Sequence, residues 1–215
     1  LMAGLLLAMS SQSVSAEERT IDISGSNSAD SYLVYNSSIS VPADDIVNAK
    51  INARYCYFSS TISGSGVLNI YGGGDRCFLG GEKGKTWPNW TNYTGNVHIY
   101  KLAESSYSAG FYGVVLAYGG KSSSPENALA DVKSGKVNPS MANNRVTLHD
   151  GATMVCETST NGAGFRIGEL NTEAGSTLQG YYKKSRSVYY LLGGLNTDAT
   201  LAGTIKPTDY DNGTS

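Results

Sequence analysis

Apolar and polar residues alternate in short segments along this chain, and glycine or other turn residues separate the segments. In the clearest segment, Leu68 and Ile70 alternate with Val67, Asn69 and Tyr71. A period of two indicates a strand with one buried and one exposed face, because successive side chains of a strand point to opposite sides. Similar segments predict strands over residues 20–24, 31–35, 38–41, 50–58, 97–100, 111–118 and 144–149.

The segments also recur in a fixed order, in which a glycine precedes a short strand and an apolar pair ending in glycine follows after a gap. Copies begin at Gly66, Gly151 and Gly175. The last two starting positions give a period in the twenties. Such a period with strand-like content is typical of stacked β coils, each of which covers the apolar face of its neighbour. We therefore expect an all-β solenoid with irregular coils.

Composition agrees with strands and turns rather than helices. The chain has 215 residues, with 26 glycines, 15 tyrosines and only 16% charged residues. One short helix is expected over residues 125–132, because Ser124 can cap it and Pro125 suits the first helical position. No linker divides the chain, so we expect one domain. The net charge of −2 provides no basic field for nucleic acid.

The first sixteen residues are typical of a secretory signal peptide. About nine apolar residues, too few to span a bilayer, are followed by Val14-Ser-Ala16, which resembles a small-x-small cleavage site. Residues 17–215 are then the mature β domain, without a membrane span, and its expected location is secreted or on the cell surface. No basic segment precedes Leu1, and turn residues follow Ile205. We expect the natural chain to extend beyond both ends of this sequence.

The three cysteines are Cys56, Cys77 and Cys156, and their spacings match no zinc or redox motif. A disulfide between Cys56 and Cys77 is conceivable after export, since adjacent coils would bring these two positions together. The preferred interpretation is that Cys56 and Cys156 are small strand residues. The disulfide state stays open.

Several segments share their glycine spacing with a known class of repeat. Residues 64–70 and 92–97 resemble the pattern G-x-G-x-L-x-L … N-x-Y-x-G-x-[TV] of autotransporter-associated β-strand repeats. Residues 146–154 resemble the V-x-L-x-x-G-A-x-L element of the same proteins, and residues 195–205 resemble their L-x-x-x-x-x-[FL]-x-G-x-I strand. The resemblance covers residues 60–205, with a gap around residues 100–143.

This resemblance implies a right-handed parallel β-helix on the surface of bacteria, as part of a longer array. It further implies a non-enzymatic adhesin or scaffold. Because the same fold also carries polysaccharide lyases and glycoside hydrolases, fold alone does not decide the function. The alternative is therefore a protein that binds or degrades polysaccharides.

Residues for catalysis are hard to find. The carboxylates are scattered, and the adjacent pair Asp44 and Asp45 fits a solvated turn better than a glycosidase pair. His98 and His149, the two histidines of the chain, sit beside apolar residues and are interpreted as ordinary strand positions. We predict no catalytic residue, no metal site and no cofactor.

Aromatic residues give the candidate binding sites. Trp87, Trp90 and Tyr93 lie in or beside a polar loop and are predicted to form a platform that stacks on sugars. The alternative is that the tryptophans cover the outside of the solenoid or plug a corner.

A second candidate binding site is a basic and aromatic tip. The preferred interpretation of this tip is a solvated hairpin, and the alternative is contact with an acidic glycan. Its residues are Tyr182, Lys183, Lys184 and Arg186. The expected partners at either site are glycans or proteins of host and cell surfaces.

Overall fold

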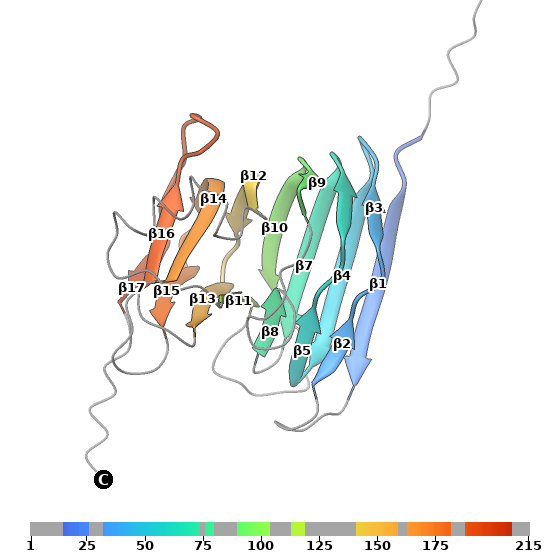
Figure 1. Ribbon diagram of the computed structural model, residues 1–215, viewed down its shortest axis with the longest axis horizontal. Helices are drawn as coiled ribbons and strands as arrows, with labels where there is room; N and C mark the ends of the chain where they lie inside the picture. Colours follow the sequence, from blue (N-terminus) through green and yellow to red (C-terminus); the bar gives the residue numbers. More distant parts are fainter. Residues whose placement is uncertain are drawn as a thin grey trace, which may run out of the picture.

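The computed structural model describes residues 15–25, 32–73, 76–79, 90–103, 113–118, 141–158, 163–181 and 188–207. All regular secondary structure in these ranges is β-strand, and every strand pair is parallel (Figure 1). The helix expected over residues 125–132 lies outside the described residues. No described helix is long and apolar enough to cross a membrane.

The strands form three sheets, which we call A, B and C. Sheet A contains, in spatial order, β1 (Glu18–Gly25), β4 (Ile46–Ala53), β7 (Val67–Gly73), β10 (Asn96–Lys101), β12 (Met141–Leu148), β14 (Ala163–Thr172) and β16 (Val188–Leu192). Sheet B contains β2 (Leu33–Tyr35), β5 (Tyr55–Phe58), β8 (Arg76–Leu79), β11 (Gly113–Tyr118), β13 (Thr153–Thr158), β15 (Thr177–Tyr181) and β17 (Thr204–Lys206). Sheet C contains β3 (Ile39–Val41), β6 (Ile62–Gly64) and β9 (Asn92–Tyr93).

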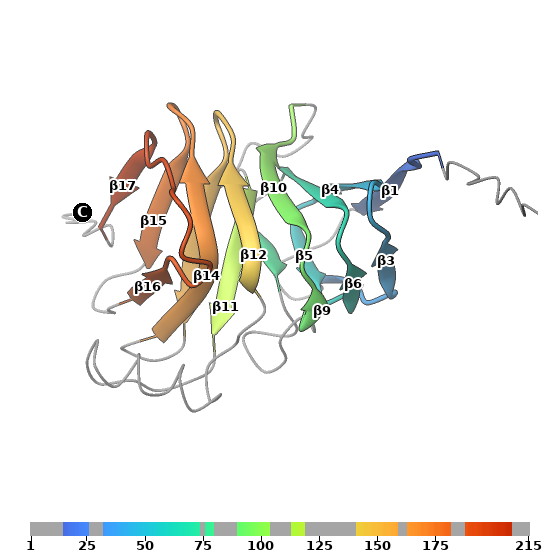
Figure 2. The same cartoon turned by 90° about the horizontal axis from the view of Figure 1, so that it is seen from above.

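The chain visits sheet A and then sheet B in every coil, so successive coils stack along one axis (Figure 2). The prediction of an all-β parallel solenoid is therefore confirmed. Coil length is irregular, as expected. The register partners Asn48 and Asn69 are 21 residues apart, whereas the equivalent corner positions Gly95 and Asn144 are 49 residues apart. Sheet A stays continuous because the extra residues of the longer coil come after β10 and before β12 in the chain, while these two strands pair directly.

Side chains that face the lumen of the solenoid form in-register columns. Val47, Leu68, Val97, Val146 and Leu170 occupy equivalent positions on successive strands of sheet A and are all buried. Full burial of one such side chain contributes roughly 1.5–3 kcal/mol. The alternation predicted from the sequence around Leu68 thus determines which face is inside.

Cys56 and Cys77 form one pair of this buried ladder, since they are register partners on β5 and β8. Both are free thiols. Burial raises the pKa of Cys56 to about 12, and burial, with a smaller contribution from Cys56, raises the pKa of Cys77. The interpretation of Cys56 as a small strand residue is confirmed.

Neighbouring coils pack closely at the corner between sheets C and A. A Cβ atom on Gly95 would lie 1.9 Å from the carbonyl oxygen of Gly66 in the preceding coil, so a side chain cannot be accommodated there without movement. In the next coil, Asn144 occupies the equivalent position and is fully buried. Its Nδ2 donates hydrogen bonds to the carbonyl oxygens of Tyr93 at 3.0 Å and Gly95 at 2.9 Å.

Candidate functional site

Two of the three rings predicted to form a sugar platform belong to the interior. Trp90 and Tyr93 are fully buried and pack edge to face, with ring centroids 6.2 Å apart. The hydroxyl of Tyr93 donates to the carbonyl oxygens of Gly66 at 3.0 Å and Asn96 at 2.8 Å. Because a ring without accessible surface cannot stack on a sugar, the prediction is wrong for these two residues. The alternative, that the tryptophan plugs a corner, describes Trp90; Trp87 lies outside the described residues.

The basic and aromatic tip also lies outside the described residues. Tyr182, Lys183, Lys184 and Arg186 therefore stay a prediction. The neighbouring strand β16 is described, and there the hydroxyl of Tyr190 donates to the carbonyl oxygen of Gln179 at 2.7 Å.

The adjacent acidic pair has the role in a turn that the sequence indicated. Asp44 has a left-handed φ of 71°, and the Oδ1 atom of Asp45 accepts a hydrogen bond from the backbone N–H of Glu17 at 3.0 Å. The backbone of Asp44 thus forms the turn before β4, and the carboxylate of Asp45 ties that turn to the residue before β1.

The two histidines, in contrast, come together on the outer face of sheet A. The Nδ1 atom of His98, on β10, lies 2.8 Å from the Nε2 atom of His149, which follows β12. The Nδ1 atom of His149 lies 2.9 Å from the Oε1 atom of Glu173, which follows β14. The three side chains form a continuous row, which we call the histidine row (His98, His149 and Glu173).

Parallel register explains how residues so far apart in the chain meet. The ladder continues past the strand ends, because the N–H of His149 bonds to the carbonyl of Ile99 and the N–H of Glu173 bonds to the carbonyl of Leu148. His149 therefore occupies the position beside Tyr100, and Glu173 the position beside His149. The interpretation of the histidines as ordinary strand positions describes their backbone but misses this contact.

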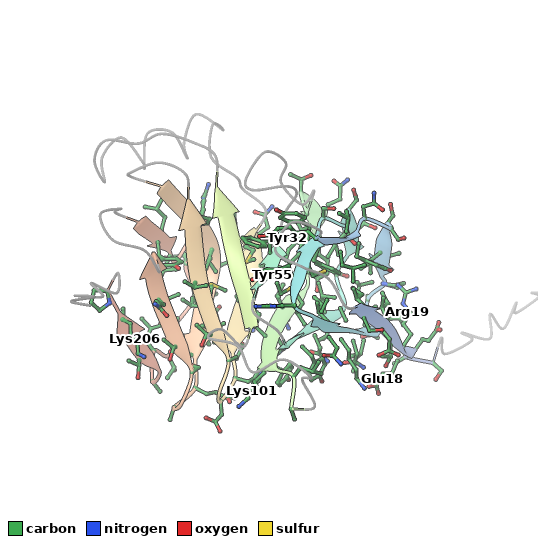
Figure 3. All side chains as sticks on the ribbon, turned by 90° about the horizontal axis from the view of Figure 1, so that it is seen from below. Glu18, Arg19, Tyr32, Tyr55, Lys101 and Lys206 are labelled. Atoms are coloured by element: carbon green, nitrogen blue, oxygen red, sulfur yellow. The ribbon has the colours of Figure 1, made fainter. Side chains whose placement is uncertain are left out.

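An aromatic stack supports the histidine row. Tyr71 and Tyr100 are register partners with ring centroids 4.8 Å apart, and the ring of Tyr100 lies 4.0 Å from that of His149 at an interplanar angle of 5°. Lys101, which follows Tyr100 at the end of β10, is labelled in Figure 3. Stacking on both faces restricts the ring of Tyr100, and stacking on Tyr100 restricts the imidazole of His149.

The surroundings shift the pKa values of His98 and Tyr100 on the outer face of sheet A. Burial lowers the pKa of His98 from its ordinary value, and the nearby His149 lowers it further, while Glu173 opposes the shift. Burial, with contributions from Tyr71 and Glu173, raises the pKa of Tyr100. Both shifts favour the uncharged form of the side chain.

The column that contains Tyr71 and Tyr100 continues toward β1 through Lys50 and Asp22, and a shallow cavity lies there. It has a volume of about 260 Å³. Its lining residues are Asp22, Ile23, Ser24, Lys50, Asn52 and Leu102. The outer face of sheet A thus offers charged, aromatic and imidazole groups along one line.

A separate polar network lies on the same face. The carboxylate of Glu169, only 3% exposed, pairs with Arg145 at 2.7 Å and accepts hydrogen bonds from Asn171 and Thr197. Burial acts to raise the pKa of Glu169, but the hydrogen bonds from Thr197, Arg145 and Asn171 outweigh it and hold this pKa below its ordinary value.

Nearer the first coil, Asn69 donates to Asn48 and Asn48 donates to Glu18, both at 2.8 Å. Each link joins neighbouring coils.

Comparison with other proteins gives no family for this chain. No protein-family model matches it, and no curated protein shows significant sequence similarity to it. The geometry alone defines the class of protein, which is a parallel β-solenoid.

Sequence reasoning missed the histidine row, although the signal was present. Aligning Val97 with Val146 and Ile99 with Leu148 places Tyr100 beside His149 directly.

Proposed function

We propose that this chain is a segment of an exported bacterial surface protein, in which the β-solenoid serves as a non-enzymatic adhesin or scaffold. The observation that carries this proposal is a set of side-chain bonds that join neighbouring coils on the outer face of sheet A. Asn48, Asn69 and Glu169 use their polar groups for such links. Residues tied in this way stiffen a rod, whereas an active site needs polar groups that face a substrate.

Export rests on the segment of residues 1–16, and surface display rests on the resemblance to autotransporter-associated repeats. Both are properties of the sequence, and a solenoid of parallel coils fits a rod-like surface segment. Figure 3 shows Glu18 and Lys206 at opposite ends of the described solenoid.

The test is a turnover assay on residues 17–215 with neutral and acidic polysaccharides. Released reducing ends and unsaturated sugars report hydrolysis and elimination respectively. We expect neither product above a boiled control. Product formation that persists through purification would overturn the non-enzymatic function.

A polysaccharide-binding or polysaccharide-degrading protein is the second candidate. The observation that favours it is the line of Asp22, Lys50, Tyr71, Tyr100 and the histidine row beside the shallow cavity. Phenol and imidazole groups are suited to hydrogen bonds with glycan hydroxyls, and a histidine held by a carboxylate is suited to general-base catalysis.

A glycan array separates the two candidates. Binding by residues 17–215 that is lost in Tyr100→Ala would support a glycan site on sheet A. Binding lost in Trp87→Ala but kept in Tyr100→Ala would place the site at the polar loop instead. Absence of binding to every glycan would leave the scaffold.

A further inference from the structure

The fold brings together the two histidines of a chain that contains no others. They are 51 residues apart in sequence, yet Nδ1 of His98 and Nε2 of His149 are separated by 2.8 Å in adjacent coils. We propose that His98 and His149 bind a divalent late transition-metal ion, and Cu²⁺ most tightly, on the outer face of sheet A. Imidazole nitrogen suits Cu²⁺, Ni²⁺ and Zn²⁺, and Cu²⁺ stands highest in the affinity order of these ions.

The distance fits two neighbouring ligands of one ion. Metal–imidazole bonds are about 2.0–2.1 Å long, so two nitrogens at a right angle around an ion lie about 2.9 Å apart. The observed 2.8 Å therefore needs little change in separation. The rings must rotate so that both lone pairs point to one side of the line that joins the nitrogens. Such rotation changes side-chain angles and leaves the ladder of sheet A intact.

Glu173 prepares His149 for this role. Its carboxylate lies 2.9 Å from Nδ1 of His149 and can only accept a hydrogen bond when ionised, so it holds the proton on Nδ1. The lone pair of Nε2 then faces His98. A carboxylate that orients a ligating histidine through the other ring nitrogen is the usual outer partner of a metal ligand.

Binding requires one proton to move within His98. The proton that Nδ1 of His98 shares with His149 transfers through water to Nε2 of the same ring, which frees Nδ1 as a ligand. Two neutral imidazoles donate one lone pair each, and the net charge of the ligands does not change.

The protein supplies two ligands, and water fills the remaining positions of the ion. Among the described residues no group of three or more histidine, cysteine, aspartate or glutamate side chains is placed to hold a metal ion. A site with open positions can accept a ligand from outside, such as a carboxylate or hydroxyl of a partner molecule. This inference does not depend on the proposed function.

The experiment titrates residues 17–215, freed of any polyhistidine tag and carrying Cys156→Ser to remove a competing soft ligand, with CuCl₂ at neutral pH. Isothermal calorimetry gives stoichiometry and affinity, and electron paramagnetic resonance reports nitrogen ligands of Cu²⁺. We expect one ion per chain with hyperfine splitting from two imidazoles. His98→Asn or His149→Asn should abolish this signal, and Glu173→Gln should weaken binding about 10–100-fold.

Arg145→Gln is the matched control, because it changes a polar residue of the same face and keeps both histidines. It should bind Cu²⁺ like the parent protein. Circular dichroism of every variant establishes that the solenoid is folded. For a histidine variant that fails to fold, imidazole ¹⁵N shifts of the parent protein on addition of Zn²⁺ provide the second measurement, and both rings should respond. Binding that survives in the double variant His98→Asn/His149→Asn, or a parent protein without imidazole signals, would overturn the proposal.

Discussion

Asn144 offers a test of the corner between sheets C and A in which one group of atoms changes and the volume does not. Its buried Nδ2 donates to the carbonyl oxygens of Tyr93 and Gly95, and its Oδ1 has no hydrogen-bond partner among the described residues. The substitution Asn144→Asp replaces the donating amide with an oxygen. It creates no cavity, so any loss of stability comes from hydrogen bonding and charge.

The structure sets the size of this loss. Each of the two bonds contributes about 0.5–1.5 kcal/mol, and each buried group left without a partner costs about 1–3 kcal/mol. A carboxylate facing two carbonyl oxygens without a cation adds the cost of burying a charge. We expect Asn144→Asp to lower the free energy of unfolding by at least about 3 kcal/mol at pH 7. Asn144→Ala, which also removes the bonds but buries no charge, should cost about 2 kcal/mol.

The assay is urea unfolding followed by far-ultraviolet circular dichroism at pH 7 and pH 5. Burial raises the pKa of the new carboxyl group, so acid restores one donor and the Asp variant should recover part of its stability at pH 5. The Ala variant has no such group and should lose the same amount at both pH values. The reasoning would be refuted if Asn144→Asp were within about 0.5 kcal/mol of the parent protein at pH 7.

Three further predictions concern other parts of the solenoid. The pKa of Glu169 is held below its ordinary value of 4.5, so the stability that its carboxylate contributes is full above pH 4.5 and is lost as the pH falls through the lower folded pKa. In urea unfolding, Glu169→Gln should therefore cost about 1 kcal/mol at pH 7 and almost nothing in strong acid. Gly95→Ala should cost more than about 2 kcal/mol in the same assay, because its Cβ would meet a backbone carbonyl at 1.9 Å. The control is Gly25→Ala, which should be within about 1 kcal/mol of the parent because the nearest atom to a Cβ there is 3.5 Å away. Equal costs for the two variants would contradict the steric argument. Cys56 and Cys77 are buried with raised pKa values, so mass spectrometry should find both unmodified by iodoacetamide in the native protein at pH 8 and alkylated in urea, and rapid native alkylation would show that the lumen is open.

The interior of the solenoid could be predicted from local sequence, because burial in a strand follows a period of two. The predicted alternation places Leu68 and Ile70 together on one face, and that face is buried. The same reasoning failed at Trp90 and Tyr93, where polar neighbours indicated an exposed loop. Near a corner, the direction of a side chain depends on the coil beneath it, and no local pattern reports that.

The histidine row shows the second limit. His98 and His149 meet because β10 pairs with β12 across a long insertion, so that the step between these coils far exceeds the period of the clear repeats. A period read from the regular copies cannot give the register across such an insertion. Comparison of the two strands by their buried residues can, because only one alignment places Val97 over Val146 and Ile99 over Leu148.

The parallel pairing of the coils determines how the solenoid responds to mechanical tension. Backbone hydrogen bonds between coils run along the long axis, so a pull on the two ends of the chain loads the outermost coil first and peels it away before the next. Neighbouring strands are about 4.8 Å apart. A released coil of 21 residues, as between Asn48 and Asn69, extends to about 70 Å. Under tension the chain would lengthen in steps of several nanometres, one coil at a time. Each step would dissipate the mechanical energy needed to separate one coil from the next.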